Sequence, residues 1–134
     1  MSDTLMRLRE ALPALLEQLE QPQLVVVFGS VAAGSAGFDS DLDLALQCRR
    51  ALSAEQRISL TAWLAEVTGR PVDLIDLRVA GEPLRGQVIR HGIRLWGSDG
   101  DWADLGMRHV LDMADFVPLL QRALKERRDA WINS

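Results

Sequence analysis

Two aspartates spaced two residues apart are the side chains in this sequence best suited to metal-dependent chemistry. Asp41 and Asp43 open a segment, residues 41–47, in which every second residue is leucine. This alternation predicts a half-buried strand with both carboxylates on one face, roughly 6.5 to 7 Å of rise apart. Two carboxylates so close repel each other unless a cation lies between them. Because Mg²⁺ typically takes one or two carboxylates plus phosphate oxygens, the pair predicts a magnesium site for a nucleoside triphosphate.

A glycine–serine pair precedes these aspartates and offers groups that bind phosphate. Gly29 and Ser30 follow the continuous apolar run of residues 24–28. Glycine lets the backbone approach a phosphate closely, and backbone N–H groups with a serine hydroxyl can donate hydrogen bonds to it. The small residues at 32–37 leave room for a bulky ligand, and Ser40 lies directly before the first carboxylate. We therefore predict that Gly29, Ser30 and Ser40 bind the nucleotide.

A third carboxylate is available from a later apolar segment, residues 72–77, which contains Asp73 and Asp76. The two aspartates have opposite parity in a strand, so only one of them can face the site. A third acid would complete a site for two metal ions and would accept the proton of an attacking hydroxyl. By parity alone, either aspartate could be that acid.

The elements that position these residues follow from hydrophobic periodicity and from cap signals. The sequence predicts an α/β (α+β) fold, a small mixed sheet flanked by helices, in a single domain over residues 1–134. The catalytic core lies at about 22–97 and a helical region at about 101–132. The expected helices cover residues 4–20, a short stretch after 30, 54–68, 83–91 and 102–131 with a break near Pro118, and the expected strands cover 24–28, 41–47, 72–77 and 93–96.

Composition narrows the class of protein. A net charge of −4 argues against general nucleic-acid binding, which depends on clustered Lys and Arg. No apolar run approaches the ~20 residues of a membrane span, and charged residues interrupt the N-terminus where a signal peptide would lie. We therefore expect a cytoplasmic protein with no direct nucleic-acid or membrane partner. Cys48 is predicted to be a buried thiol, and His91 and His109, which lack a paired ligand at metal spacing, to have structural or surface roles.

The motifs resemble those of a known family. Gly29-Ser30, ten intervening residues and Asp41-Leu42-Asp43 match the G-S-x10-D-x-D signature of the DNA polymerase β-like nucleotidyltransferase superfamily, and residues 29–44, GSVAAGSAGFDSDLDL, are similar to its minimal nucleotidyltransferase family. Residues 71–77 and 89–96 resemble that family's third-acid strand and closing segment. The resemblance implies a polymerase β-like fold, ATP as substrate, two Mg²⁺ ions, and Asp41, Asp43 and Asp73 as catalytic metal ligands. Asp73 is preferred to Asp76 because the family's acid comes early in its strand.

The resemblance also implies a partner. Short standalone members similar to this chain are antitoxins of MntA/HepT toxin–antitoxin pairs, which add AMP to a tyrosine of a HEPN-type ribonuclease toxin, neutralise it and form a hetero-oligomer with it. The chain contains no tyrosine, so a tyrosine acceptor must lie on another molecule. The alternatives are transfer to a small molecule, as in aminoglycoside nucleotidyltransferases, and a non-catalytic antitoxin that acts by binding alone.

Two amphipathic stripes allow either intramolecular packing or contact with a partner. One runs from Leu5 to Leu19, and the other is in the C-terminal helical region. The interpretation that we favour is packing on the chain's own sheet, with docking of a helical partner or of a second copy as the alternative. The C-terminal stripe consists of Val110, Met113, Val117, Leu120 and Leu124.

Overall fold

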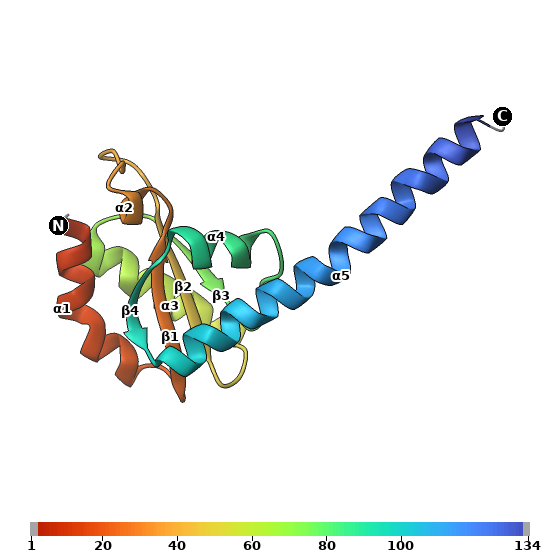
Figure 1. The fold of residues 1–134 in the computed structure, drawn as a ribbon. Helices are drawn as coiled ribbons and strands as arrows, with labels where there is room; N and C mark the ends of the chain where they lie inside the picture. The colour runs from red at the N-terminus through yellow and green to blue at the C-terminus, as the bar shows by residue number, and fades with distance from the viewer. Residues whose placement is uncertain (1–2, 133–134) are drawn as a thin grey trace.

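One mixed sheet forms the centre of the protein. The computed structural model describes residues 3–132, apart from the side chains of residues 115–117. Within this range four strands lie in the order β3-β2-β1-β4, with β1 antiparallel to both β2 and β4 and with β2 parallel to β3 (Figure 1). The mixed sheet flanked by helices confirms the predicted fold class. The strands are β1 (Pro22–Phe28), β2 (Leu42–Cys48), β3 (Val72–Asp76) and β4 (Ile93–Gly97).

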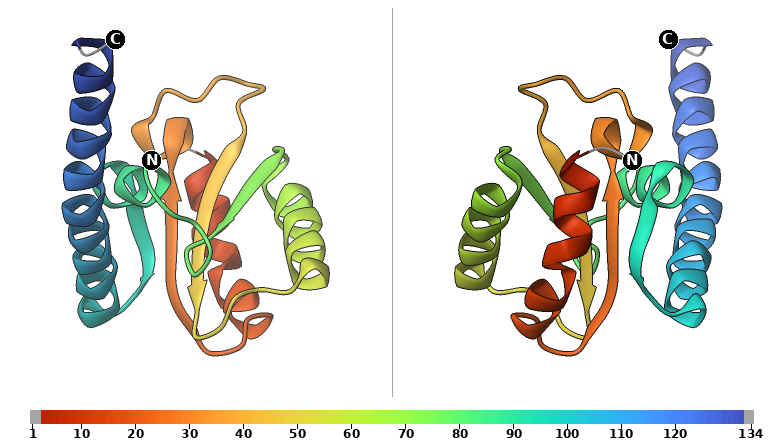
Figure 2. Two further views of the ribbon diagram at one scale, coloured as in Figure 1. Left: turned by 90° about the vertical axis from the view of Figure 1, so that its right-hand side faces the viewer. Right: turned by 90° about the vertical axis from the view of Figure 1, so that its left-hand side faces the viewer.

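Helices cover both faces of the sheet, so the protein has two hydrophobic cores. Helices α1 (Asp3–Glu17) and α3 (Ala54–Thr68) pack on the face that carries Val25, Val27 and the leucines of β2. Helix α4 (Leu84–His91) and the start of α5 (Asp99–Ile132) cover the other face, where Val88 and Leu105 pack against β1 (Figure 2). The N-terminal stripe therefore packs within the protein, as we favoured: its leucines at 5, 8, 15 and 19 are buried in the first core.

Strand β2 differs from the sequence prediction in its burial. A half-buried strand was expected over residues 41–47, but β2 lies inside the sheet and is covered on both faces. Ala45 is fully buried and Gln47 is 3% exposed, while Asp41 lies outside the strand, one residue before its start. Alternation was a poor guide to burial here because helices from distant parts of the sequence cover the face opposite the leucines. Cys48, at the end of β2, is a free buried thiol, as predicted.

Helix α3 begins and ends where local signals predict. The hydroxyl of Ser53 accepts a hydrogen bond from the N–H of Gln56 at 3.1 Å, and the Gln56 side chain accepts one from the N–H of Ser53 at 2.8 Å. This capping box satisfies two N–H groups that the first turn leaves unpaired. At the other end Gly69 adopts a left-handed conformation with φ +69°, which favours glycine. The helix is the crossover that allows β3 to lie parallel to β2.

Helix α5 contradicts two expectations. It runs without interruption from Asp99 to Ile132, although a break was predicted near Pro118. The carbonyl that Pro118 deprives of a partner belongs to Ala114, which is exposed, so water can replace the lost hydrogen bond. The C-terminal stripe does not pack on the sheet, because Val110, Leu120 and Leu124 are 59%, 45% and 56% exposed. Val117 lies outside the described side chains.

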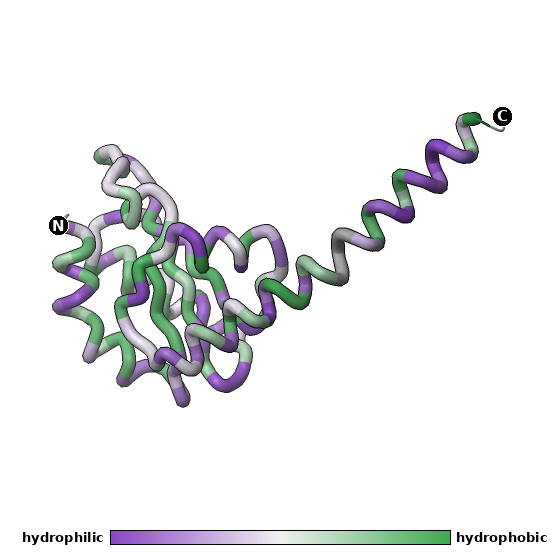
Figure 3. Tube along the Cα trace, in the orientation of Figure 1, coloured by the Kyte–Doolittle hydropathy of each residue, from purple (hydrophilic) through white to green (hydrophobic). Residues whose placement is uncertain are grey.

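The far half of α5 extends away from the sheet and carries its apolar residues in the open (Figures 1 and 3). Leu105 is its one fully buried hydrophobic residue among the described side chains. Periodicity showed that the helix has an apolar stripe but not what covers it. None of the helices within residues 3–132 combines the length and the hydropathy that crossing a lipid bilayer requires.

Candidate active site

Asp43 and Asp73 lie side by side on neighbouring strands. The parallel register of β2 and β3 pairs Asp43 with Asp73, and the antiparallel register of β1 and β2 pairs Asp43 with Phe28 on the other side. Partners in register point to the same face of a sheet, here the face covered by α4 and α5. Asp73 is exposed and Asp43 is partly buried. The sheet therefore brings together two of the three predicted acids.

Gly29 lies directly against the Asp43 carboxylate. Its φ is +71°, and a Cβ at this position would lie 2.1 Å from an Oδ of Asp43. A side chain here would thus meet both backbone strain and a clash with a predicted catalytic group. Ser30 follows in the short helix α2 (Gly29–Ala33). The predicted proximity of the glycine–serine pair to the second aspartate is present in the fold.

Gly29→Ala is expected to destabilise the fold more than Gly34→Ala, a matched control. Both glycines have positive φ, but the space around Gly34 is open, and a Cβ there would meet no other group within 4 Å. Strain alone costs about 1–2 kcal/mol in the left-handed region. The excess loss at position 29, measured by chemical denaturation, reports the contact with Asp43. Equal losses at the two positions would contradict the close approach.

Asp41 adds a third negative charge that acts on Asp43, and we call Asp41, Asp43 and Asp73 the acidic group. It is exposed and precedes β2. Burial of the Asp43 carboxyl raises its pKa above the ordinary value, and the charges of Asp73 and Asp41 raise that pKa further. The part of this shift that comes from Asp73 and Asp41 reflects negative potential at Asp43, which a bound cation would relieve.

The loop before Asp41 is held in place by Arg70. One Nη of Arg70 donates to the carbonyl of Gly37 at 2.8 Å and to the carbonyl of Ser40 at 3.0 Å. The hydroxyl oxygen of Ser40 accepts from the N–H of Gly37 at 2.8 Å. Ser40 therefore helps to shape the loop that leads into the acidic group, and its contact with a nucleotide stays a prediction.

Asp76 has a different environment from Asp73. It is 3% exposed, and its carboxylate accepts hydrogen bonds from the backbone N–H of Leu52 at 2.7 Å and of Arg78 at 2.9 Å. Those contacts hold the end of the loop before α3 against the end of β3. Asp76 thus has a structural role. It lies on the opposite face of β3 from Asp73, as the parity of the two positions predicted.

A pocket opens between the acidic group and α4. Its volume is about 620 Å³, within the usual range for sites that bind small molecules. Helix α4, which contacts α2, contributes residues at positions 84, 87 and 91. The sequence reasoning gave α4 no part in the site and missed Gln87 and His91, although their 3–4 spacing places them on one helix face. The lining residues are Phe28, Gly29, Ser30, Ala33, Ser35, Asp43, Asp73, Leu84, Gln87 and His91.

The donor set fits magnesium with a nucleotide. Carboxylate oxygens are hard ligands, and Mg²⁺ usually binds one or two of them and fills its other positions with phosphate oxygens and water. Among residues 3–132, no group of three or more His, Cys, Asp or Glu side chains is close enough to hold a metal ion. Asp43 and Asp73, with Asp41 nearby, match the smaller protein contribution that a magnesium–triphosphate complex needs.

Comparisons with known proteins agree with this geometry. Residues 10–101 match the family described as "Polymerase beta, Nucleotidyltransferase". The protein adenylyltransferase MntA of Shewanella oneidensis is 36% identical over 87 residues, which cover 65% of this chain and 63% of that protein. The match thus spans less than two thirds of the relative.

Two solved structures extend the likeness to most of the chain. A toxin–antitoxin crystal structure with AMP-PNP has a TM-score of 0.77 and 28% identity, covering 89% of this chain and 96% of the other. A tri-AMPylated Shewanella oneidensis HEPN toxin in complex with its MNT antitoxin gives a TM-score of 0.74 and 25% identity, covering 92% of this chain and 97% of the other.

Proposed function

Because this chain belongs to the polymerase beta nucleotidyltransferase family, we propose that it transfers AMP from ATP to a tyrosine hydroxyl of a HEPN-type ribonuclease toxin and thereby neutralises the toxin. The observation that carries the proposal is the register of Asp43 with Asp73, beside Gly29 and open to a pocket of suitable size. The proposal assigns catalysis to residues 22–97 and docking of the partner to the helix beyond residue 101. It requires access to ATP and hence a cytoplasmic location.

In this proposal the nucleotide lies between the glycine–serine turn and the acidic group. The backbone at Gly29 and the hydroxyls of Ser30 and Ser40 take the triphosphate. Asp43 and Asp73, which lie in register, would hold Mg²⁺, and Asp41 would be the third ligand from the end of the preceding loop. When bound, the metal neutralises phosphate charge and lowers the pKa of an attacking hydroxyl. The apolar side chains of Phe28, Ala33 and Leu84 leave part of the pocket suited to a base.

The transfer is a substitution at the α-phosphorus. The tyrosine oxygen forms a bond to that phosphorus, and the bond to the oxygen bridging the α- and β-phosphates breaks. Pyrophosphate leaves with the electron pair of the broken bond. The hydroxyl proton passes to a carboxylate, and Asp73 is our assignment because it is exposed beside Asp43, whereas Asp76 is buried and accepts from two backbone N–H groups.

The acceptor is assigned from the relatives and from the chain's own composition. One structural relative is a complex with an AMPylated HEPN toxin, and this chain has no tyrosine of its own. The exposed stripe of α5 offers a surface for a helical protein. The proposal therefore requires the formation of a hetero-oligomer.

The test is transfer of label from ATP. Purified protein is mixed with Mg²⁺, ATP labelled at the α-phosphate and the HEPN-type protein encoded beside it. Label on a tyrosine of the partner supports the proposal, and label on none of the candidate proteins contradicts it. Pyrophosphate release that depends on an aminoglycoside and needs no protein would favour a small-molecule transferase. Neutralisation by the double variant Asp41→Asn/Asp43→Asn would favour binding alone.

Leu120→Ser with Leu124→Ser is expected to weaken binding of the toxin and leave nucleotide binding unchanged. The two leucines lie one turn apart on the exposed part of α5, far from the pocket lining. Loss of apolar anchors from an interface typically costs about 1–2 kcal/mol or more, so affinity measured by calorimetry should fall about fivefold or more. Glu126→Ala, on the same exposed helix, is the control. Unchanged affinity in the double variant would remove α5 from the interface.

A further inference from the structure

Helix α4 is the shared element between the pocket and α5. One face of α4 presents Leu84, Gln87 and His91 to the pocket. Three of its other residues, Arg85, Gly86 and Val88, are buried. Whatever fixes α4 therefore also fixes one wall of the nucleotide pocket.

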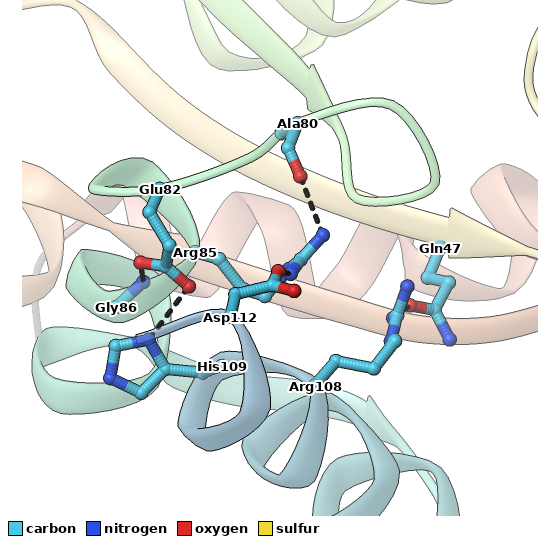
Figure 4. Close-up of polar contacts among 8 residues, drawn as sticks. All are labelled: Gln47, Ala80, Glu82, Arg85, Gly86, Arg108, His109 and Asp112. Carbon is cyan, nitrogen blue, oxygen red and sulfur yellow. Dashed lines mark hydrogen bonds and ion pairs between the residues drawn. The ribbon is translucent and has the colours of Figure 1, made fainter. Parts of the chain in front are cut away.

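A glutamate holds α4 and α5 together at the N-terminus of α4. One carboxylate oxygen of Glu82 accepts a hydrogen bond from the N–H of Gly86 at 3.1 Å, and the other contacts Nδ1 of His109 at 2.7 Å (Figure 4). A carboxylate is an acceptor, so the His109 ring donates from Nδ1. The Glu82 and His109 side chains are only 17% and 15% exposed. A Cβ at Gly86 would lie 2.8 Å from the His109 ring, so the two helices meet without room for a side chain there.

An arginine–aspartate pair forms the second connection. The Arg85 guanidinium pairs with the carboxylate of Asp112 on α5 and donates to the carbonyl of Ala80 at 2.9 Å (Figure 4). The Arg85 side chain is 10% exposed. A buried guanidinium needs its charge partner, because an unpaired charge inside a protein is costly. Asp112 therefore decides the position of Arg85 and, through it, of α4.

Beyond the buried Leu105, these polar contacts join α5 to α4. On α5 the described apolar residues after Leu105 are largely exposed. Beyond Asp112 the helix extends away from the sheet (Figure 1) and carries the exposed Leu120 and Leu124, which the proposed docking places in the contact with the toxin. The two contacts thus lie between the proposed docking surface and the pocket wall.

We propose that His109 and Asp112 of α5 are positioning residues for the nucleotide pocket and that they act through Glu82, Arg85 and α4. Neither lines the pocket. The inference rests on the proposed function because it takes this pocket to bind ATP. It predicts that nucleotide affinity depends on the contacts of His109 and Asp112 with Glu82 and Arg85.

The test measures binding of AMP-PNP with Mg²⁺ to the isolated full chain by calorimetry. Asp112→Asn removes the negative charge that pairs with Arg85 and keeps the size and shape of the side chain. Coupling between sites typically amounts to 5–150-fold, so we expect affinity to fall about fivefold or more. Asp129→Asn, the same change in an exposed ion pair of α5 with an N–O distance of 3.8 Å, should leave affinity within about twofold.

A second pair of variants keeps the test independent of one substitution. His109→Ala should weaken AMP-PNP binding, and His109→Gln, which retains a donor, should restore part of it. Hydrogen exchange should become faster in α4, residues 84–91, and stay unchanged in α3, residues 54–68. Equal acceleration in both helices would mean general destabilisation and would overturn the positioning role.

The outcomes separate this inference from the proposed function. If wild type binds AMP-PNP and both Asp112→Asn and His109→Ala bind it equally well, the positioning role is wrong and the proposed function stands. If wild type with Mg²⁺ does not bind AMP-PNP at all, the nucleotidyltransferase assignment of the pocket fails, and this inference fails with it.

Discussion

Asp43→Asn is expected to reduce the rate of AMP transfer by about a hundredfold to a thousandfold. The variant loses several kcal/mol of the charge stabilisation that the metal provides in the transition state. Each 1.4 kcal/mol corresponds to a factor of ten in rate. Asp43 is the central acid, paired in register with Asp73 and lying against Gly29. Asparagine keeps the size of the side chain and removes the anionic ligand. The measurement is the single-turnover rate of label transfer at saturating ATP and Mg²⁺.

The same variant should not lose stability. Burial and the neighbouring carboxylates raise the pKa of Asp43 in the folded protein, so ionisation of this group costs the native state stability as the pH rises through that raised pKa. A neutral side chain removes this cost, and at neutral pH the variant should unfold at the same denaturant concentration as wild type or at a higher one. Asp39→Asn, in the exposed loop that precedes β2, is the control for a general loss of charge. Full activity of Asp43→Asn would exclude the proposed metal site.

Local patterns predicted that Gly29 lies close to Asp43. The small residues between Gly29 and Asp41 allow the chain to return beside the strand it has just left. Antiparallel pairing of β1 with β2 then places Asp43 next to Gly29. Such features depend on backbone geometry over a few residues, which the sequence encodes directly.

The features that the sequence analysis missed depend on contacts between distant segments. The polar-facing side of β2 was expected to be solvated, but α4 and α5 cover it, and Gln47 is buried where Arg108 of α5 donates to its side chain. The apolar stripe of α5 predicted burial, whereas most of it is exposed. Periodicity identifies a face that favours contact, and the partner of that face depends on the rest of the fold.

Asp73→Asn and Asp76→Asn are expected to have opposite effects on activity and stability. If Asp73 accepts the hydroxyl proton, its loss should slow transfer by about a hundredfold to ten-thousandfold. Because Asp73 is exposed and adds negative charge beside Asp43, its replacement should change the free energy of unfolding by no more than about 0.5 kcal/mol. The rate is measured by label transfer and the stability by chemical denaturation.

Asp76→Asn is the matched comparison, the same substitution three residues along the same strand. Its buried carboxylate accepts from two backbone N–H groups, those of Leu52 and Arg78. An amide has one oxygen in place of two, so one of these N–H groups would face an NH₂ group, at a cost of about 1–3 kcal/mol. Transfer by the folded fraction should persist, because Asp76 does not line the pocket. The reverse result, with transfer abolished only by the change at Asp76, would show that β3 presents its acid from the other face and would overturn the assignment of Asp73.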